Sequence, residues 1–176
     1  LVGSEMCIRD SIRLTTFSTL FARYKGDFAA QLAGAAAIDT LKDGDRVLIA
    51  EGCSHHVTCD DIGRVKIPNW MKKYTGRELK FEWTQGADFP DNLEDYALVV
   101  HCGGCMLNRA EVRRRINECA RQGVKVTNYG IVISKMQGVL ERVVKGIADA
   151  GATGSVSATG SISDTGSISD TGEEGD

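Results

Sequence analysis

The sequence lacks several features that would assign it to a common class of protein. No run approaches the ~18 apolar residues that a membrane-spanning helix needs, so no membrane association is expected. No glycine is followed by lysine, which excludes the phosphate-binding loop G-x-x-x-x-G-K-[ST]. The chain also lacks a strong excess of charge of one sign. Five of its 24 acidic and none of its 21 basic residues lie in the last 26 positions, so the rest of the chain is nearly neutral. The near-neutral remainder gives no electrostatic reason to expect nucleic-acid or membrane binding.

Histidine is scarce, and its three copies are not scattered. His55 and His56 lie within three residues of Cys53, and His101 directly precedes the segment Cys102-Gly103-Gly104-Cys105, here called the CGGC loop. Thiolates and imidazoles in two short segments are typical of proteins that hold an iron–sulfur cluster or a zinc ion. The pattern therefore predicts a metal site with the ligands Cys53, His55, Cys102 and Cys105.

The residue pattern alone leaves the fourth ligand open. His55 is the natural candidate by spacing, whereas His56, Asp60 and an exchangeable water are alternatives. His101 should point to the opposite face of its strand from its neighbours, so we predict a packed histidine rather than a ligand. Cys119 should pack in a helix.

The ligand set alone does not choose between iron and zinc. The wide separation of the two segments favours a four-iron four-sulfur cluster, as do two glycines whose N–H groups can approach sulfur closely. A structural zinc site, a redox-active CGGC pair and a set of buried structural thiols are the alternatives.

Apolar patterns predict alternating strands and helices. Strands are expected over 47–50, 80–84, 97–101 and 124–127. One helix is expected from the cap at Asp27 to Leu41, and a second over 69–75 after Pro68. A third should begin after Asn108, which can form a capping box with Glu111, and a last amphipathic helix should run from Met136 to Ile147. This order predicts an α/β fold, with a small parallel β-sheet flanked by helices. Both ligand segments directly follow strands, which places the metal cluster at the carboxyl ends of the strands.

The helix after the CGGC loop should bury Val112, Ile116, Cys119 and Ala120. Its arginines are expected to form a solvated face; they are Arg109, Arg113, Arg114, Arg115 and Arg121. Asn128-Tyr129-Gly130 follows the fourth strand on the same edge of the sheet, as a strand-to-helix turn that could line the site.

The two ends of the chain differ from its body. Residues 1–11 match neither the pattern nor the composition of the body, and we interpret them as a non-native extension. Residues 149–176 contain three copies of one Gly/Ser/Thr hexamer, over 154–159, 160–165 and 166–171. Such a tract cannot bury enough apolar surface to offset its ordering entropy, so it is predicted to be a disordered tail.

Residues 14–142 closely resemble the HydF family, the GTPase and scaffold proteins of iron–iron hydrogenase maturation. The resemblance is carried by LTTFSTLFARYKGD (14–27), DRVLIAEGCSHH (45–56), DDIGRVKIP (60–68), HCGGCMLNR (101–109) and TNYG (127–130). It implies that residues 12–24 end a dimerisation domain and that residues 25–148 form an iron–sulfur cluster-binding domain. The family's GTPase domain, and with it GTP, is expected upstream, so no catalytic residue is predicted here.

The resemblance also implies a function. Cys53, Cys102 and Cys105 would hold a four-iron four-sulfur cluster, with His55 as the matching histidine of the motif. The cluster would anchor a transient di-iron precursor that arrives from radical-SAM maturases and passes to the iron–iron hydrogenase apo-protein. A homodimer in a reducing, anaerobic cytoplasm, plastid, mitochondrion or hydrogenosome is the expected setting. The alternative is a zinc-stabilised α/β interaction module with no role in cofactor transfer.

Overall fold

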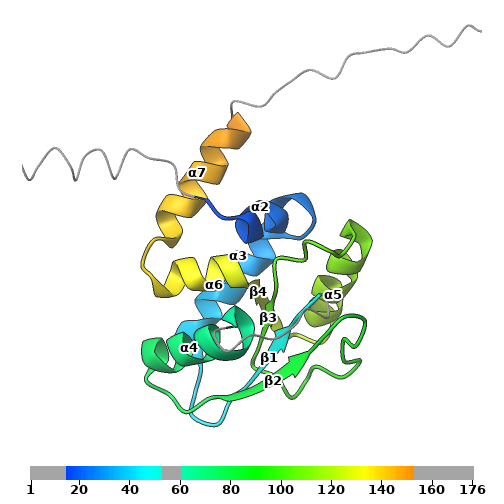
Figure 1. The fold of residues 1–176 in the computed structure, drawn as a ribbon, viewed down its shortest axis with the longest axis vertical. Helices are drawn as coiled ribbons and strands as arrows, with labels where there is room; N and C mark the ends of the chain where they lie inside the picture. The colour runs from blue at the N-terminus through cyan, green and yellow to red at the C-terminus, as the bar shows by residue number, and fades with distance from the viewer. Residues whose placement is uncertain (1–14, 53–60, 153–176) are drawn as a thin grey trace, which may run out of the picture.

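The computed structural model describes residues 15–52 and 61–152, with side chains to residue 147. Its centre is one sheet of four parallel strands in the order β2-β1-β3-β4 (Figure 1). The strands are β1 (Arg46–Ala50), β2 (Lys80–Thr84), β3 (Leu98–His101) and β4 (Lys125–Asn128). The predicted α/β fold with a small parallel sheet is thereby confirmed. The extension 1–11 and the repeats of the tail lie outside the described residues.

The central strands explain why the sheet forms where it does. Every residue of β3 is buried, as are the last four of β1, so both strands are covered on both faces. β1 pairs with both neighbours in register, with Ala50 opposite Thr84 of β2 and His101 of β3. Short, continuous apolar strands of this kind are typical of parallel sheets.

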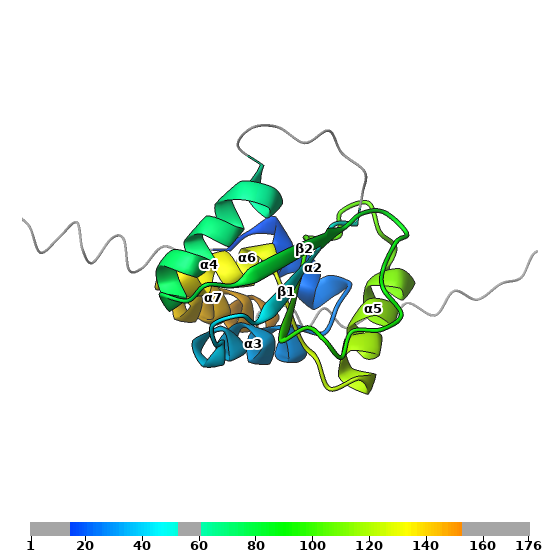
Figure 2. The same ribbon diagram turned by 90° about the horizontal axis from the view of Figure 1, so that it is seen from below.

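Helices cover the two faces of the sheet (Figure 2). On one face lie α4 (Ile67–Thr75) and α6 (Tyr129–Met136), together with the 3-10 turn η1 (Ala37–Thr40). On the other face lie α5 (Arg109–Arg121) and the segment 85–97. Each face has its own apolar core; the first includes Ile38, Val47, Ile49, Ile67, Met71 and Val100, and the second Leu48, Leu93, Val99, Val112, Ile116 and Cys119.

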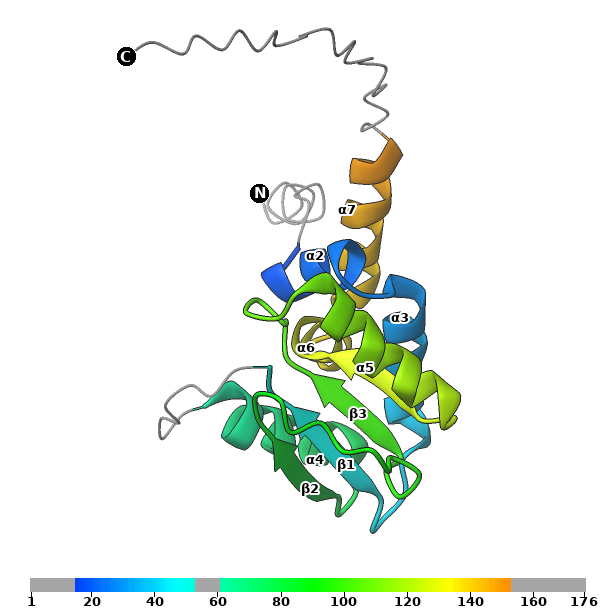
Figure 3. The ribbon, with the colours of Figure 1, turned by 90° about the vertical axis from the view of Figure 1, so that its right-hand side faces the viewer.

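A further helix, α2 (Phe17–Tyr24), lies at the carboxyl end of the sheet. It lies beyond the end of β3 (Figure 3) and packs against α3 (Phe28–Ala36) and α6. The side-chain amide of Asn128, at the end of β4, donates a hydrogen bond to the backbone oxygen of Ser18 in α2, at 2.8 Å. α2 was not predicted from the sequence, yet it is joined to the sheet edge where the two ligand segments begin.

α3 covers the edge strand β4 at very close range. A Cβ atom added at Gly34 would lie 1.9 Å from the backbone oxygen of Val126 and 2.4 Å from its carbonyl carbon. No other residue type fits this helix–strand contact without moving backbone. Asp27 caps α3 as predicted, with its side chain accepting from the backbone N–H of Ala30 at 2.9 Å.

Three local predictions were wrong. The helix predicted from Met136 begins only at Leu140, as α7 (Leu140–Ala152), because α6 ends at Met136 and Gly138 adopts a left-handed φ of 70° between the two helices. α7 also runs four residues into the segment predicted as tail. On α5, Ala120 is exposed and Arg115 is buried, because Arg115 points toward the core between polar partners.

The capping box of α5 is only half formed. Asn108 accepts from the backbone N–H of Glu111 at 2.8 Å, as predicted. The Glu111 carboxylate instead accepts from Arg114 and Arg115, at 2.8 and 2.7 Å. The hydrogen bond from Arg114, followed by the one from Arg115, lowers the pKa of Glu111 from its ordinary value to about 2.

This shift predicts a contribution of Glu111 to acid stability. Because the folded-state pKa lies below the unfolded value, the stabilisation is fully present above about pH 4.5 and is lost as the pH falls towards 2. We expect it to amount to about 1–2 kcal/mol, since Glu111 is partly exposed. Urea unfolding of the wild type and Glu111→Gln at pH 7, 4.5 and 3 measures it. Equal loss of stability by both proteins between pH 4.5 and 3 would contradict the assignment.

Candidate metal centre

The candidate site begins where β1 and β3 end side by side. Cys102 directly follows β3, and its backbone N–H donates to the backbone oxygen of Ala50, the last residue of β1, at 2.8 Å. The chain leaves β1 toward β2 on one side and β3 toward β4 on the other. The pair β1/β3 is therefore the switch point of the sheet, where ligands of open α/β folds bind.

The sulfur of Cys102 sits among backbone N–H groups. Gly52 donates to Cys102 Sγ at 3.0 Å, and Gly104 donates at 3.4 Å. Hydrogen bonds of this kind favour the charged thiolate, which is the form that binds metal. Gly104 reaches its position with a left-handed φ of 65°. Cys105, in the same loop, is exposed.

Gly52 and Gly103 let neighbouring elements pack closely around this loop. A Cβ atom at Gly52 would lie 2.8 Å from the side chain of Leu107, and one at Gly103 would lie 2.9 Å from Ser18 Oγ. The end of β1, the CGGC loop and α2 are therefore in contact through backbone that carries no side chain. This close fit holds Gly52 beside the Cys102 sulfur.

The structure tests only part of the predicted ligand set. Cys53, His55, His56 and Asp60 lie outside the described residues. Within ranges 15–52 and 61–152, no three His, Cys, Asp or Glu side chains gather in a way that could hold a metal ion. The structure does place Cys102 and Cys105 in one loop, with Cys102 beside Gly52, the residue that precedes Cys53 in the sequence.

His101 is a packed histidine, as predicted. It is 3% exposed, its Nδ1 lies 2.7 Å from the backbone oxygen of Cys102, and its Nε2 lies 3.4 Å from Arg115 Nη1. Burial lowers the pKa of His101 to about 4. The neutral ring is thus held below the CGGC loop, between the loop backbone and a buried guanidinium.

The role of Arg115 was not predicted from the sequence. Its guanidinium is buried, pairs with Glu111 at 2.7 Å, donates to the backbone oxygen of Gly86, and lies 5.0 Å from the ring centre of Phe89. The expectation of a uniformly solvated arginine face is therefore wrong at this position. Only the spacing of Glu111 and Arg115, one turn apart on a helix, was a readable signal.

Glu51 is a second buried ionic group, at the carboxyl end of β1. It is 1% exposed, and its Oε2 accepts from Gln85 at 3.0 Å and faces Arg64 at 3.4 Å. Within the described residues, Glu51 Oε1 and the Tyr129 hydroxyl have no hydrogen-bond partner. A Cβ atom at Gly63 would collide with both the Tyr129 hydroxyl and Glu51 Oε1.

The environment of Tyr129 also changes its acidity. Burial, and then the Glu51 carboxylate, raise the pKa of Tyr129. The sequence signal for a special role of Glu51 was its position as a carboxylate directly after an apolar strand.

Cys119 packs in the core, as predicted. It is fully buried on α5, and burial raises the pKa of its thiol to about 12. Cys105, by contrast, is exposed.

The contrast predicts selective alkylation of the metal-free protein. With iodoacetamide at pH 8 we expect rapid labelling of Cys105 and at least about 100-fold slower labelling of Cys119, since reaction requires an accessible thiolate. Peptide mass spectrometry before and after addition of urea measures both rates. Comparable labelling of the two thiols in the folded protein would contradict the burial of Cys119.

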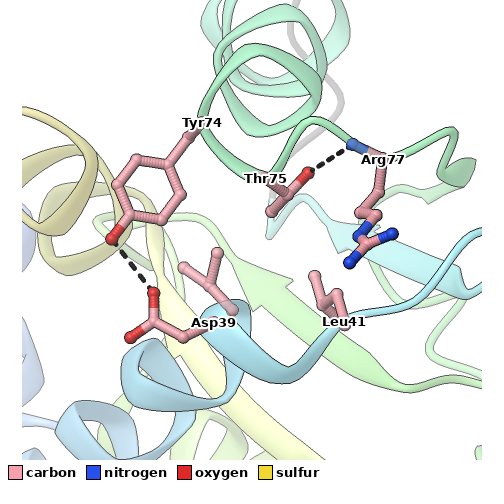
Figure 4. A pocket seen from close by; sticks show the side chains of 6 residues that line it. Asp39, Leu41, Tyr74, Thr75 and Arg77 are labelled. Carbon is pink, nitrogen blue, oxygen red and sulfur yellow. Dashed lines mark hydrogen bonds between the residues drawn. The ribbon is translucent and has the colours of Figure 1, made fainter.

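A hollow elsewhere on the molecule has no ligand chemistry of this kind. About 240 Å³ in volume, it lies near the amino ends of the strands and is lined by Ile38, Asp39, Leu41, Tyr74, Thr75 and Arg77 (Figure 4). Tyr74 donates to Asp39 at 3.0 Å, and Lys135 donates to the same carboxylate at 2.7 Å. The other polar groups of the lining are also bonded within the protein, Thr75 to the backbone oxygen of Met71 and Arg77 to Asp43.

The fold and the loop together define a doubly wound α/β domain that presents cysteine thiols at its switch point. A sequence model of the hydrogen maturase F (HydF) tetramerization domain matches residues 29–146. The chain therefore belongs to the HydF family, which places it in hydrogenase maturation and supports oligomer formation. A search of curated proteins gives no match. In the described part of the chain, no helix has the length and apolar character needed to cross a membrane.

Proposed function

We propose that this domain holds a four-iron four-sulfur cluster that anchors a di-iron precursor during maturation of iron–iron hydrogenase. The observation that carries the proposal is the environment of Cys102, whose sulfur accepts two backbone hydrogen bonds at the switch point. Cys105 is exposed in the same loop, and Gly52 brings the chain to Cys102 one residue before Cys53. Thiolates with N–H donors around sulfur are the usual setting of such clusters.

Each part of the chain has a role in this proposal. Cys53, Cys102 and Cys105 supply three thiolates, and His55 is the proposed fourth ligand, with His56 and Asp60 as alternatives. A cubane bound by three cysteines supplies one iron whose fourth position can be exchanged. Gly52 and Gly104 donate hydrogen bonds to the Cys102 sulfur, and His101 fills the space under the loop without acting as a ligand.

The di-iron precursor is cargo rather than a resident cofactor. We propose that it arrives from radical-SAM maturases and is delivered to the apo-hydrogenase, in a reducing, anaerobic compartment. The family match supports self-association, and a homodimer or the tetramer of the domain's name would present several such sites. GTP belongs to the domain that family members carry upstream.

Anaerobic reconstitution with iron and sulfide tests the proposal. We expect about four irons per chain, absorbance near 400 nm, and a reduced-cubane electron paramagnetic resonance signal that changes on adding cyanide or imidazole. Iron that washes away and leaves one tightly held zinc would overturn the proposal. The same residues would then form a structural zinc site in an interaction module.

A further inference from the structure

Lys25, directly after α2, has an unusual set of partners. Its Nζ donates to three backbone oxygens of one loop: Gly104 at 3.0 Å, Cys105 at 3.1 Å and Leu107 at 2.8 Å. An ammonium has three N–H donors, so this loop uses all of them. The nitrogen also lies 4.6 Å from the ring centre of Phe21 in α2, which is a cation–π contact.

These bonds fix the part of the CGGC loop that faces the sheet end. Gly104 has a left-handed φ and donates its N–H to Cys102 Sγ, while its carbonyl accepts from Lys25. One peptide segment is therefore held on both sides, by a sulfur and by an ammonium. The exposed Cys105 lies between two of the carbonyls that Lys25 binds.

We propose that Lys25 is a positioning residue for the cluster ligands Cys102 and Cys105. It holds the Gly104–Leu107 backbone in the shape that presents both thiols, and it places one positive charge beside the thiolates. This inference rests on the proposed cluster for its electrostatic part only, since the loop contacts are made between groups of the chain itself.

The charge has a consequence that a purely structural contact would not have. A reduced cluster carries one more negative charge than an oxidised one, so a nearby cation stabilises the reduced state. Loss of the ammonium should therefore move the reduction potential to more negative values. It should also loosen the loop and speed the loss of iron.

Lys25→Met tests both parts, because methionine keeps an apolar stem near Phe21 and removes the charge and the donors. Lys25→Arg keeps the charge, although its planar fork cannot reproduce three bonds from one atom. Lys73→Met, at an exposed lysine of α4, is the matched control, and circular dichroism checks the fold of every variant. Should Lys25→Met not fold, Lys25→Gln replaces it as a neutral side chain with donors.

The first measurement is amide hydrogen exchange of the metal-free protein over residues 103–107. We expect exchange about tenfold faster in Lys25→Met, partial recovery in Lys25→Arg and no change in Lys73→Met. After reconstitution, Lys25→Met should lose iron to a chelator several-fold faster and show a more negative potential, which Lys25→Arg restores. Unchanged exchange in Lys25→Met overturns the positioning role, and an unchanged potential overturns the electrostatic role. A wild type that takes up no cluster defeats the proposed function, while the exchange experiment still decides the positioning role.

Discussion

Replacing Cys102 with alanine is expected to abolish cluster binding while leaving the domain folded. The Cys102 sulfur is the described thiol that receives two backbone hydrogen bonds, and a methyl group cannot take its place as a ligand. Iron and sulfide after anaerobic reconstitution should fall from about four per chain to less than one, and the absorbance near 400 nm should disappear. The circular dichroism spectrum should not change, because Cys102 lies at the rim of the sheet and not in its core.

Cys119→Ala is the matched control, because it also removes a cysteine sulfur, but from the core of the domain and not from the proposed site. Cys119 is fully buried in the core between α5 and the sheet. Its removal should lower the free energy of unfolding by about 1–2 kcal/mol and leave the iron content unchanged. Full iron in Cys102→Ala, or loss of iron in Cys119→Ala, would show that the ligands are assigned wrongly.

Gly34→Ala is expected to destabilise the domain strongly, against the usual preference of helices for alanine. In a free helix this substitution stabilises by about 1 kcal/mol. Here the added methyl group would overlap the backbone carbonyl of Val126, at 1.9 Å from its oxygen, so α3 must move away from β4. We expect the free energy of unfolding to fall by about 3 kcal/mol and the melting temperature by roughly 10 °C.

The control for this prediction is the neighbouring position in the same helix. Ala33 is exposed, and Ala33→Gly should cost only the helix propensity of about 1 kcal/mol. Urea unfolding of both variants gives the comparison. A stabilised Gly34→Ala would show that α3 does not approach β4 as closely as described.

Much of the fold could be predicted because its signals are local. Continuous apolar runs marked β1 and β3, and the caps at Asp27 and Asn108 marked two helices. The order of these elements was enough to predict a parallel sheet with both ligand segments at its carboxyl edge. The start of α7 was missed by four residues, because the apolar spacing begins at Met136 and continues across the turn at Gly138.

The contacts around the site could be predicted only in part, because they join segments far apart in sequence. The choice of Cys102 and Cys105 as ligands needed only spacing and stays a prediction; the structure places both in the loop that follows β3. That Lys25 would reach Gly104, or that Arg115 would be buried against His101, depends on how α2 and α5 dock. Charged residues on amphipathic helices and at their ends are usually solvated, and only the one-turn spacing of Glu111 and Arg115 gave a local signal for either residue.

If the domain holds the proposed cluster, the pairing of β1 with β3 also sets the moment at which metal can be captured. Ala50 and His101 are neighbours in the sheet, although fifty-one positions separate them along the chain. A growing or half-folded chain that has paired β1 only with β2 keeps the Cys102 sulfur apart from Gly52. Tight loading of that cluster would then have to wait for β1 and β3 to pair, so a filled site would report that these two strands are joined.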